Sequence, residues 1–215
     1  MQDHLVGDVV RLVDTSSVGW AGLRRWRLDR GTPAAAAGEV RQHAGTGGYR
    51  ARRMLAGSAR LAALPAVYDV LDTSGQAWLR IDLEKCAFAR TAAATVSAGD
   101  AVLGVVPPVR RMPLGIGLTV TTEDDAPLLV VPDERGLSWS ALDPAGLPVA
   151  RVEHIATRTG WIDRRVRTTG PARAAARPDD DPSLSGDVIS FERSSTPLQR
   201  GLVLGLAVCR AHPRY

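Results

Sequence analysis

Residues 201–209 form an uninterrupted apolar segment near the C-terminal end of the chain, and an arginine stands on either side of it. Thr196 suits an N-cap and Pro197 suits the first helical position, so the sequence predicts a helix over residues 197–210. A helix without a polar face must be buried on every side. A membrane span needs about 20 apolar residues, far more than this segment contains, so we expect a core helix surrounded by protein.

Two features of this predicted helix bear on its surroundings. Gly201 and Gly205 stand four residues apart, which is typical either of a seam between membrane helices or of close contact with strands in a soluble core. We favour the close contact, because a glycine weakens a helix by about 1 kcal/mol and its missing side chain must therefore serve packing. Each fully buried aliphatic side chain contributes roughly 1.5 to 3 kcal/mol. The expected core residues of the helix are Leu198, Leu202, Val203, Leu204, Leu206 and Val208.

From residue 66 onward the sequence repeats a strand, a turn and a strand. β-Branched and aromatic residues flank turns in which a glycine accepts a positive φ, as in the Asp-x-x-Gly units that begin at Asp72 and Asp143. Repeated hairpins of this kind indicate an all-β sandwich or barrel. We expect hairpins that join 67–72 to 76–82, 138–143 to 147–152 and 117–122 to 128–131, together with strands at 100–106 and 187–192.

The other segments carry weaker patterns. Residues 5–13 predict one or two strands, residues 31–48 a loop or a weakly formed segment, and residues 52–64 a short amphipathic helix. The arginines after residue 162 are expected on the exposed side of a strand, and residues 170–186 have the composition of a mobile loop.

A closed antiparallel barrel around the apolar C-terminal helix buries both the hairpins and the helix, and it removes exposed sheet edges. The units from Tyr68 to Ile81 and from Trp139 to Val152, followed by the strand at 187–191 and the apolar helix, resemble the tubby C-terminal-like superfamily. Within it, the phospholipid scramblase and LURP-one-related branch is the most similar.

This resemblance covers residues 66–210. It implies a mainly β fold, with a barrel of about twelve strands around a central hydrophobic C-terminal helix. We therefore divide the chain into a tubby-like barrel domain, 66–215, and an N-terminal basic segment, 1–65, that contributes the first strands and a short helix.

Basic charge is concentrated in the first third of the chain. Arginine supplies 26 of the 27 basic residues, and residues 1–66 have a net charge of +5 whereas the remainder has −1. This distribution admits two interpretations, an arginine surface that attracts phosphates and a solvated basic face without a ligand. The candidate phosphate- and lipid-binding residues are Arg24, Arg25, Arg27, Arg30, Arg52, Arg53, Arg164, Arg165 and Arg167.

The sequence contains no recognisable catalytic motif. Its four histidines and two cysteines lack the spacing of metal ligands, and no Gly-x-Ser-x-Gly elbow exists. The glycines at 45–48 lack the Lys-Ser/Thr ending of a phosphate loop. We therefore expect no enzyme activity, no cofactor and no small-molecule substrate.

One acidic segment invites comparison with a calcium loop. Asp179 and Asp181 begin a run of alternate oxygen-bearing residues that ends at Asp187, and scramblase relatives carry an acidic segment proposed to bind calcium near this place. The sixth position of such a loop is Leu184 rather than glycine, and the twelfth is Ser190 rather than glutamate. We therefore favour an acidic loop without a bound ion.

The resemblance implies a barrel that engages anionic phospholipid headgroups as a peripheral membrane protein. Arginine pairs with phosphate in a bidentate manner, and each basic residue near an anionic surface contributes about 1 kcal/mol. The first alternative is a soluble scaffold for a protein partner. The second, which we favour least, is nucleic-acid binding through Trp20, Arg24, Arg25, Trp26 and Arg27.

The expected location is the cytoplasm. Met1 is followed by Gln, Asp and His before any apolar run, which is not the order of a signal peptide. The two cysteines are far apart in the sequence and fit a reducing compartment.

Overall fold

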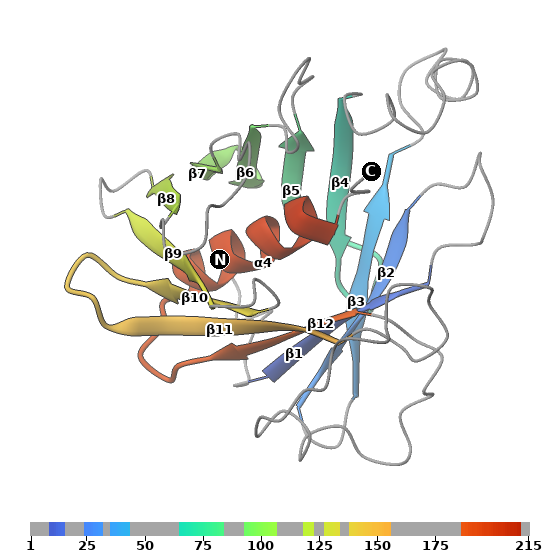
Figure 1. Ribbon diagram of the computed structural model, residues 1–215. Coiled ribbons are helices and arrows are strands. Elements are labelled where there is room, and N and C mark those ends of the chain that lie inside the picture. Colours follow the sequence, from blue (N-terminus) through green and yellow to red (C-terminus); the bar gives the residue numbers. More distant parts are fainter. Residues whose placement is uncertain are drawn as a thin grey trace, which may run out of the picture.

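The computed structural model of this protein has twelve β-strands and one α-helix in its described part (Figure 1). It describes residues 9–15, 24–31, 35–43, 65–83, 93–106, 118–122, 127–133, 138–155 and 186–211, with the backbone alone at 118–122 and at residue 155. The predicted helix at 52–64, the predicted strand around residue 166 and the predicted loop up to residue 185 lie outside these ranges.

The strands are short, with five to eight residues each. They are β1 (Val9–Asp14), β2 (Arg25–Arg30), β3 (Ala35–Gln42), β4 (Ala66–Leu71), β5 (Ala77–Leu83), β6 (Ala94–Ala98), β7 (Ala101–Val106), β8 (Leu118–Thr122), β9 (Leu128–Pro132), β10 (Ser138–Leu142), β11 (Pro148–Ile155) and β12 (Gly186–Phe191). The helix is α4 (Pro197–Ala211). The prediction of a mainly β fold that ends in an apolar helix is confirmed.

Each strand is antiparallel to both of its neighbours, and the order of pairing is circular. Consecutive strands pair from β1 to β12, and β12 then pairs with β1 in the order of a closed barrel. The shortest described ladder joins β7 to β8, where two residue pairs lie opposite each other. The N-terminal third contributes β1, β2 and β3, which connect β12 to β4.

The two ends of the strands differ in their connections. Because neighbouring strands alternate in direction, successive connections alternate between the ends. At the end where β1, β3, β5, β7, β9 and β11 finish, five of the six connections between described strands have ten residues or more, and we call it the long-connection end. At the opposite end no connection between described elements exceeds five residues, and we call it the tight-turn end.

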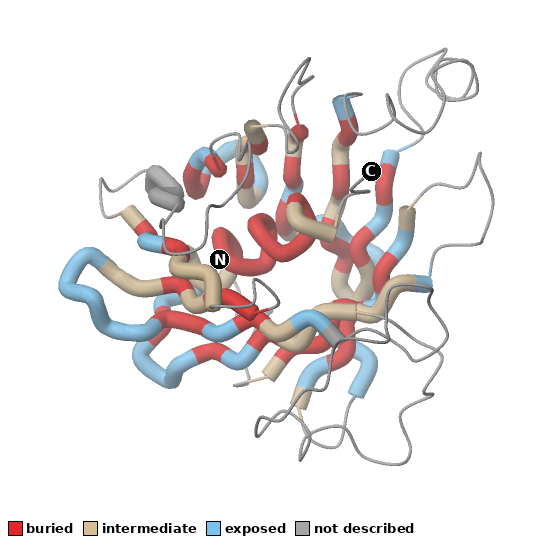
Figure 2. The backbone as a smooth tube through the Cα atoms, in the orientation of Figure 1, coloured by how far each residue is buried: buried red, intermediate tan, exposed pale blue. Residues whose placement is uncertain are grey.

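Helix α4 begins near the tight-turn end and runs through the space that the strands surround (Figure 1). Its residues from Gly201 to Cys209 are all buried, as are the inward side chains of the strands around it (Figure 2). Of the six core residues predicted for the helix, five are buried and Leu198 is partly buried against the same core. The prediction of a helix without a polar face, enclosed by protein, is confirmed.

A capping box starts this helix. The Gln199 backbone N–H donates to Thr196 Oγ1 (3.2 Å), and the Thr196 N–H donates in return to Gln199 Oε1 (2.8 Å). Pro197 occupies the first helical position, where its missing N–H is not needed. Two otherwise unpaired donors of the first turn thus find partners on the chain itself.

The two arginines that flank the apolar segment cover aromatic rings of the barrel. The guanidinium of Arg200 lies 5.2 Å from the Phe191 ring centroid, and that of Arg210 lies 5.7 Å from the Trp139 ring centroid. Arg200 Nε also donates to Ser195 Oγ (2.8 Å). At each end of the buried segment, the flanking arginine therefore makes a cation–π contact with an aromatic ring of the strands.

Both Asp-x-x-Gly units form the same tight turn. Asp72 Oδ1 accepts from the backbone N–H groups of Ser74 (2.8 Å) and Gln76 (3.0 Å), and Asp143 Oδ1 accepts in the same way from residues 145 and 147. The glycines at the third position after each aspartate have φ of 84° and 80°, a conformation that other residues rarely adopt. The predicted hairpins at these two places are confirmed.

Three strands contradict or escape the sequence analysis. The prediction of a loop at 31–48 is wrong for residues 35–42, which form β3. Gly38 explains the strand, because its φ is 148° and a Cβ there would meet the Leu71 carbonyl oxygen at 2.0 Å. Glycine thus permits a bulge against β2 and a close approach of β4, where alanine-rich sequence alone suggests little order. Strands β2 and β6 were not predicted, and Val96 of β6 is fully buried.

The two helix glycines face strands, as expected from close contact in a soluble core. A Cβ at Gly205 would lie 2.6 Å from Val96 Cγ2, whereas a Cβ at Gly201 would lie 3.0 Å from Leu103 Cδ1. Valine is held rigidly at χ1, but the end of a leucine side chain can move aside. The two positions therefore differ in what a methyl group would displace.

We predict that Gly205→Ala lowers the free energy of unfolding by about 1 to 2 kcal/mol, because overpacking against Val96 outweighs the gain in helix propensity. Gly201→Ala is the matched control and changes it by less than about 1 kcal/mol. Urea unfolding followed by tryptophan fluorescence measures both. A Gly205→Ala protein that is more stable than the wild type would contradict the close contact seen here.

Candidate functional site

The interior of the barrel is filled by the protein's own side chains. Trp26 and Tyr68 are buried, and their ring centroids lie 5.5 Å apart. Together with the helix they occupy the space in which other barrels hold a small ligand. We therefore expect a binding site of the described part on the outer wall or at the ends.

Burial of Trp26 corrects one expectation. We named this residue as a stacking platform for nucleic-acid bases, but its exposed fraction is 2% and its ring packs in the core. Trp20, the other expected platform, lies outside the described residues. The stacking argument at Trp26 is therefore wrong, because β2 turns its tryptophan inward and its arginines outward.

The four described candidate arginines lie along β2, with Arg24 and Arg25 at its start and Arg30 at its opposite end. Arg25, Arg27 and Arg30 are exposed, whereas Trp26 and Leu28 between them are buried. Arg27 makes two hydrogen bonds to the carboxylate of Asp29, each 2.9 Å long. Arg24, just before the strand, approaches Asp14 of β1 at 3.4 Å. Two of the four described candidates are thus tied to acidic neighbours.

A pair of like charges lies across β2 and β3. Arg25 and Arg41 are directly opposite each other in the register, and both are exposed. The Gln42 N–H donates to the Arg24 carbonyl (2.9 Å), so the adjacent pair of Arg25 and Arg41 is a non-hydrogen-bonded one, in which side chains lie closest. Like charges at such a pair destabilise a sheet. An anion bound between the two guanidinium groups would relieve that repulsion.

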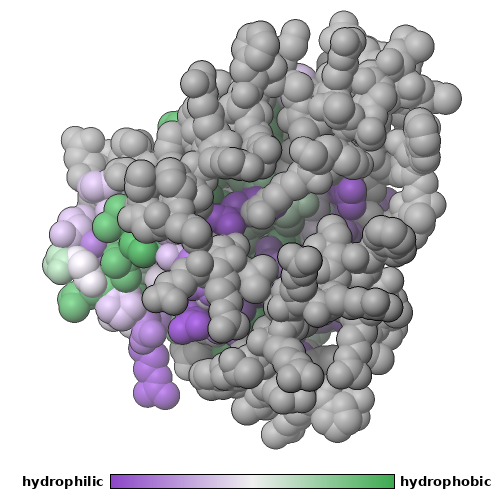
Figure 3. All heavy atoms as spheres, viewed as in Figure 1, coloured by the Kyte–Doolittle hydropathy of each residue, from purple (hydrophilic) through white to green (hydrophobic). Residues whose placement is uncertain are grey.

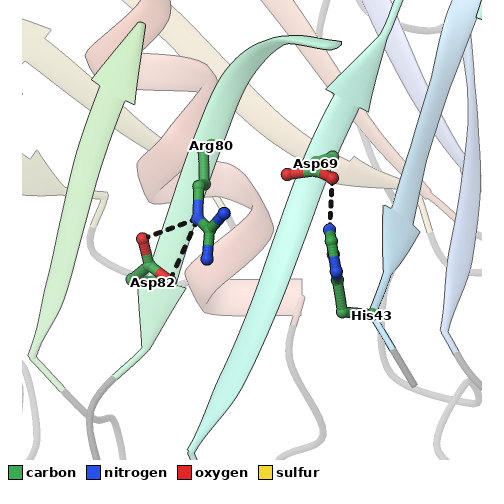
Figure 4. Close-up of polar contacts among 4 residues, drawn as sticks. All are labelled: His43, Asp69, Arg80 and Asp82. Atoms are coloured by element: carbon green, nitrogen blue, oxygen red, sulfur yellow. Dashed lines mark hydrogen bonds and ion pairs between the residues drawn. The ribbon is translucent and has the colours of Figure 1, made fainter. Parts of the chain in front are cut away.

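Elsewhere the outer wall alternates in charge along single strands. Arg80 donates to Asp82 on β5 (Nε to Oδ2, 3.0 Å; Figure 4), and Arg151 pairs with Glu153 on β11 (2.8 Å). Arg41 pairs in the same way with Glu39 on β3. The hydrogen bond that Arg80 donates to Asp82, followed by the charge of that carboxylate, raises the pKa of Arg80 above its ordinary value. Residues two apart on a strand share a face, so these pairs largely neutralise the wall.

The segments that join strands at the long-connection end are rich in basic residues. The six segments that join strands there contain sixteen Arg or Lys and seven Asp or Glu, a net of +9. Arg24 and Arg25 start β2 at this end, and Arg41 is next to the last residue of β3. The segment 43–65 joins β3 to β4 and contains Arg52 and Arg53, and the segment 156–185 joins β11 to β12.

Five of the nine candidate arginines lie outside the described residues, namely Arg52, Arg53, Arg164, Arg165 and Arg167. Of the candidate calcium ligands, Asp179 and Asp181 also lie outside. Asp187 is described, and its Oδ1 lies 2.7 Å from His154 Nδ1. Within the described ranges, no three His, Cys, Asp or Glu side chains gather as a metal site requires.

Two histidines at the long-connection end each face a carboxylate. His43 follows β3 and contacts Asp69 of β4 (Figure 4), and His154 on β11 contacts Asp187 of β12. Both imidazoles are about half exposed. Sequence reasoning missed both pairs, because each joins residues that only strand register brings together.

Apolar side chains are exposed on another part of the wall. Val102 and Val105 on β7 are each 41% exposed, and Leu129 on β9 is 40% exposed. Leu147, in the turn of the β10–β11 hairpin, is 62% exposed. At the left edge of Figure 3, over this hairpin, hydrophobic and hydrophilic side chains alternate. The exposed apolar residues are thus scattered over several strands.

No protein-family model matches the chain, and none of the curated proteins or solved structures is significantly similar to it. The resemblance to tubby-like barrels therefore stays a prediction. In the described ranges, no helix has both the length and the apolar character needed to cross a membrane.

The Cys209 thiol is shielded from reagents in solution. Its side chain is buried in α4, and burial raises the pKa of the Cys209 thiol to about 12. Thiolate is the reactive form, so this thiol is protected both by lack of access and by lack of ionisation.

We predict that a Cys86→Ser protein, whose one remaining thiol is Cys209, does not react with a chromogenic disulfide reagent at pH 8 while folded. Addition of guanidinium chloride should release one equivalent of reactive thiol. Circular dichroism of the same sample checks that the variant is folded. Rapid reaction of the folded protein would contradict the burial of Cys209.

Proposed function

We propose that this protein is a non-enzymatic barrel that binds anionic phospholipid headgroups at the cytoplasmic surface of a membrane, with its long-connection end as the binding site. The observation that carries the proposal is the net charge of +9 in the segments that join strands at this end. Anionic leaflets attract such clusters of basic residues, each worth about 1 kcal/mol near the surface.

The described rim of this end supports the proposal. Arg25 and Arg41 lie opposite each other on β2 and β3. Like charges in this arrangement do not stabilise the sheet. A lipid phosphate accepts hydrogen bonds from two guanidinium groups at once, and guanidinium is less strongly hydrated than ammonium. Because the interior is filled, binding of a ligand at the surface is favoured over binding of a ligand inside.

The same proposal includes membership of the tubby C-terminal-like superfamily, in its scramblase and LURP-one-related branch. Twelve antiparallel strands in circular order around a C-terminal apolar helix are what that resemblance implies. We also propose that the barrel is closed in solution along its whole circumference, including the short β7–β8 ladder. Amide exchange on both sides of that ladder would be slow in a closed barrel and fast in an open one.

A protein partner remains the alternative, and one observation favours it. Val102, Val105 and Leu129 are large apolar side chains with about two fifths of their surface exposed. Scattered exposed apolar residues are ordinary on protein surfaces, so we place this alternative second.

We predict that the protein sediments with vesicles that contain phosphatidylglycerol or cardiolipin, and not with phosphatidylcholine alone, in the presence of excess DNA. The double variant Arg25→Gln/Arg41→Gln should lower the partition coefficient about 30-fold, at about 1 kcal/mol for each charge. A second variant, Arg52→Gln/Arg53→Gln, tests the connection between β3 and β4 in the same way.

The matched control is the double variant Arg80→Gln/Arg151→Gln. These arginines are half exposed and each pairs with an acid two residues away, as Arg41 does, but they lie in the middle of their strands. The control removes the same charge and should change binding little. Absence of sedimentation at low salt would exclude the membrane, and loss of binding on addition of DNA would indicate a nucleic-acid ligand.

A further inference from the structure

Five neighbouring strands carry no charged residue. Strands β6 to β10 are consecutive in the order of pairing, and their 26 residues include no Asp, Glu, Lys, Arg or His. The other seven described strands contain fourteen Asp, Glu or Arg among 47 residues. We call the outward side of β6–β10, in the left half of Figure 1, the uncharged face.

The described side chains of this face are aliphatic or small and neutral. The register sets Thr95 of β6 opposite Val105 of β7, and Leu129 of β9 opposite Leu142 of β10. Val105 is 41% exposed and Leu129 is 40% exposed. Exposed valine and leucine therefore lie on both sides of β8, and what sets this face apart is the lack of charge around them.

Ion pairs border the uncharged face on both sides. The neighbouring strand β5 carries the pair of Arg80 and Asp82, and β11 carries the pair of Arg151 and Glu153. The arginine of each pair is about half exposed. Protein–protein interfaces have this composition, because charged residues are depleted at their core and polar groups form a solvated rim.

From this arrangement we infer that the uncharged face is the contact between two copies of this protein, related by a twofold axis. A twofold contact sets one patch against itself, so a charged side chain near the axis meets its own copy. Like charges that meet across an interface oppose association. Among the described strands, β6–β10 are the five neighbours over which two copies meet without such repulsion.

The side chains favour a second copy over other occupants. The large apolar residues that are exposed in the described part are valine and leucine. A surface that enters lipid headgroups is typically rich in Trp, Phe and basic residues, and hot spots for a different protein are enriched in Trp, Tyr and Arg. Contacts between identical subunits are more apolar and less charged, as this face is.

The face is large enough for a weak dimer. Five strands side by side span about 24 Å, and a five-residue strand is about 17 Å long, so the outline of the face is roughly 400 Å². Because side-chain relief adds accessible area, two copies bury on the order of 1,000 Å² in total, the lower limit for a specific interface. We therefore expect a dissociation constant in the micromolar range.

Sedimentation velocity of the full-length protein, at concentrations on both sides of the micromolar range, tests this inference. Leu129→Arg puts a charge on the face and should raise the dissociation constant of the dimer at least about 30-fold. The matched control is Leu147→Arg, because Leu147 is 62% exposed in the β10–β11 turn, outside the face. It should change the dissociation constant less than about 3-fold.

Cross-linking provides a second measurement that introduces no charge. It uses the Cys86→Ser protein, in which Cys209 is buried and is not expected to react. Val105→Cys then places one reactive thiol on the uncharged face, and Ser190→Cys places it on β12, outside the face. A short bismaleimide should link the Val105→Cys protein into covalent dimers and leave the Ser190→Cys protein monomeric.

Other outcomes overturn the inference. These are a protein that stays monomeric at the highest concentration, equal cross-linking of the two cysteine variants, and a dimer that both arginine variants weaken equally. A monomeric protein whose binding to vesicles is lost on Leu129→Arg would assign the face to the membrane instead. The inference is independent of the proposed function, since dimerisation without vesicle binding supports the first and overturns the second.

Discussion

Burial of α4 on all sides is the constraint from which the rest of this structure follows. The residues from Gly201 to Cys209 present apolar surface in every direction, so a sheet on one side would leave half of it in water. Strands that surround the helix remove that exposure, and they must approach closely where Gly205 meets Val96. The flanking arginines end the buried stretch by stacking on aromatic rings of the wall.

Because side chains fill the interior, we expect the protein to bind its ligand at the surface. Trp26, Tyr68 and the inward aliphatic side chains pack on one another or on the helix, so none of them faces a solvent-filled cavity of the lipocalin type. The outward positions pair arginine with aspartate or glutamate along single strands and carry little net charge. What distinguishes one region of the surface from another is then the charge of the connections, which the alternating strand directions sort between two ends.

The sequence was sufficient for the elements whose patterns are local. The helix 197–210 and the hairpins at Asp72 and Asp143 follow from apolar runs and turn chemistry within a few residues. Strand β3 was missed because Gly38 and its alanines fit a strand only in contact with the Leu71 carbonyl. The sequence could not predict that Arg25 and Arg41 lie opposite each other, because this arrangement depends on β3 and on the strand register. Arg27 and Asp29 stand as an Arg-x-Asp pattern in the sequence, but their pairing also went unpredicted because no strand was predicted there.

Turn chemistry and charge polarity have a common origin in the topology. In the two five-residue hairpin connections at Asp72 and Asp143, the aspartate binds the backbone N–H groups of the turn, so the turn chemistry itself places a negative charge there. Longer connections have no such requirement, and here they carry arginine. Helix α4 directs its C-terminal end, with a partial charge of about −0.5, toward the basic end, too little to offset the net charge of its connections. In this chain the connections at the two ends of the sheet therefore differ in the charge of their sequences, which is +9 at the long-connection end and −6 at the tight-turn end.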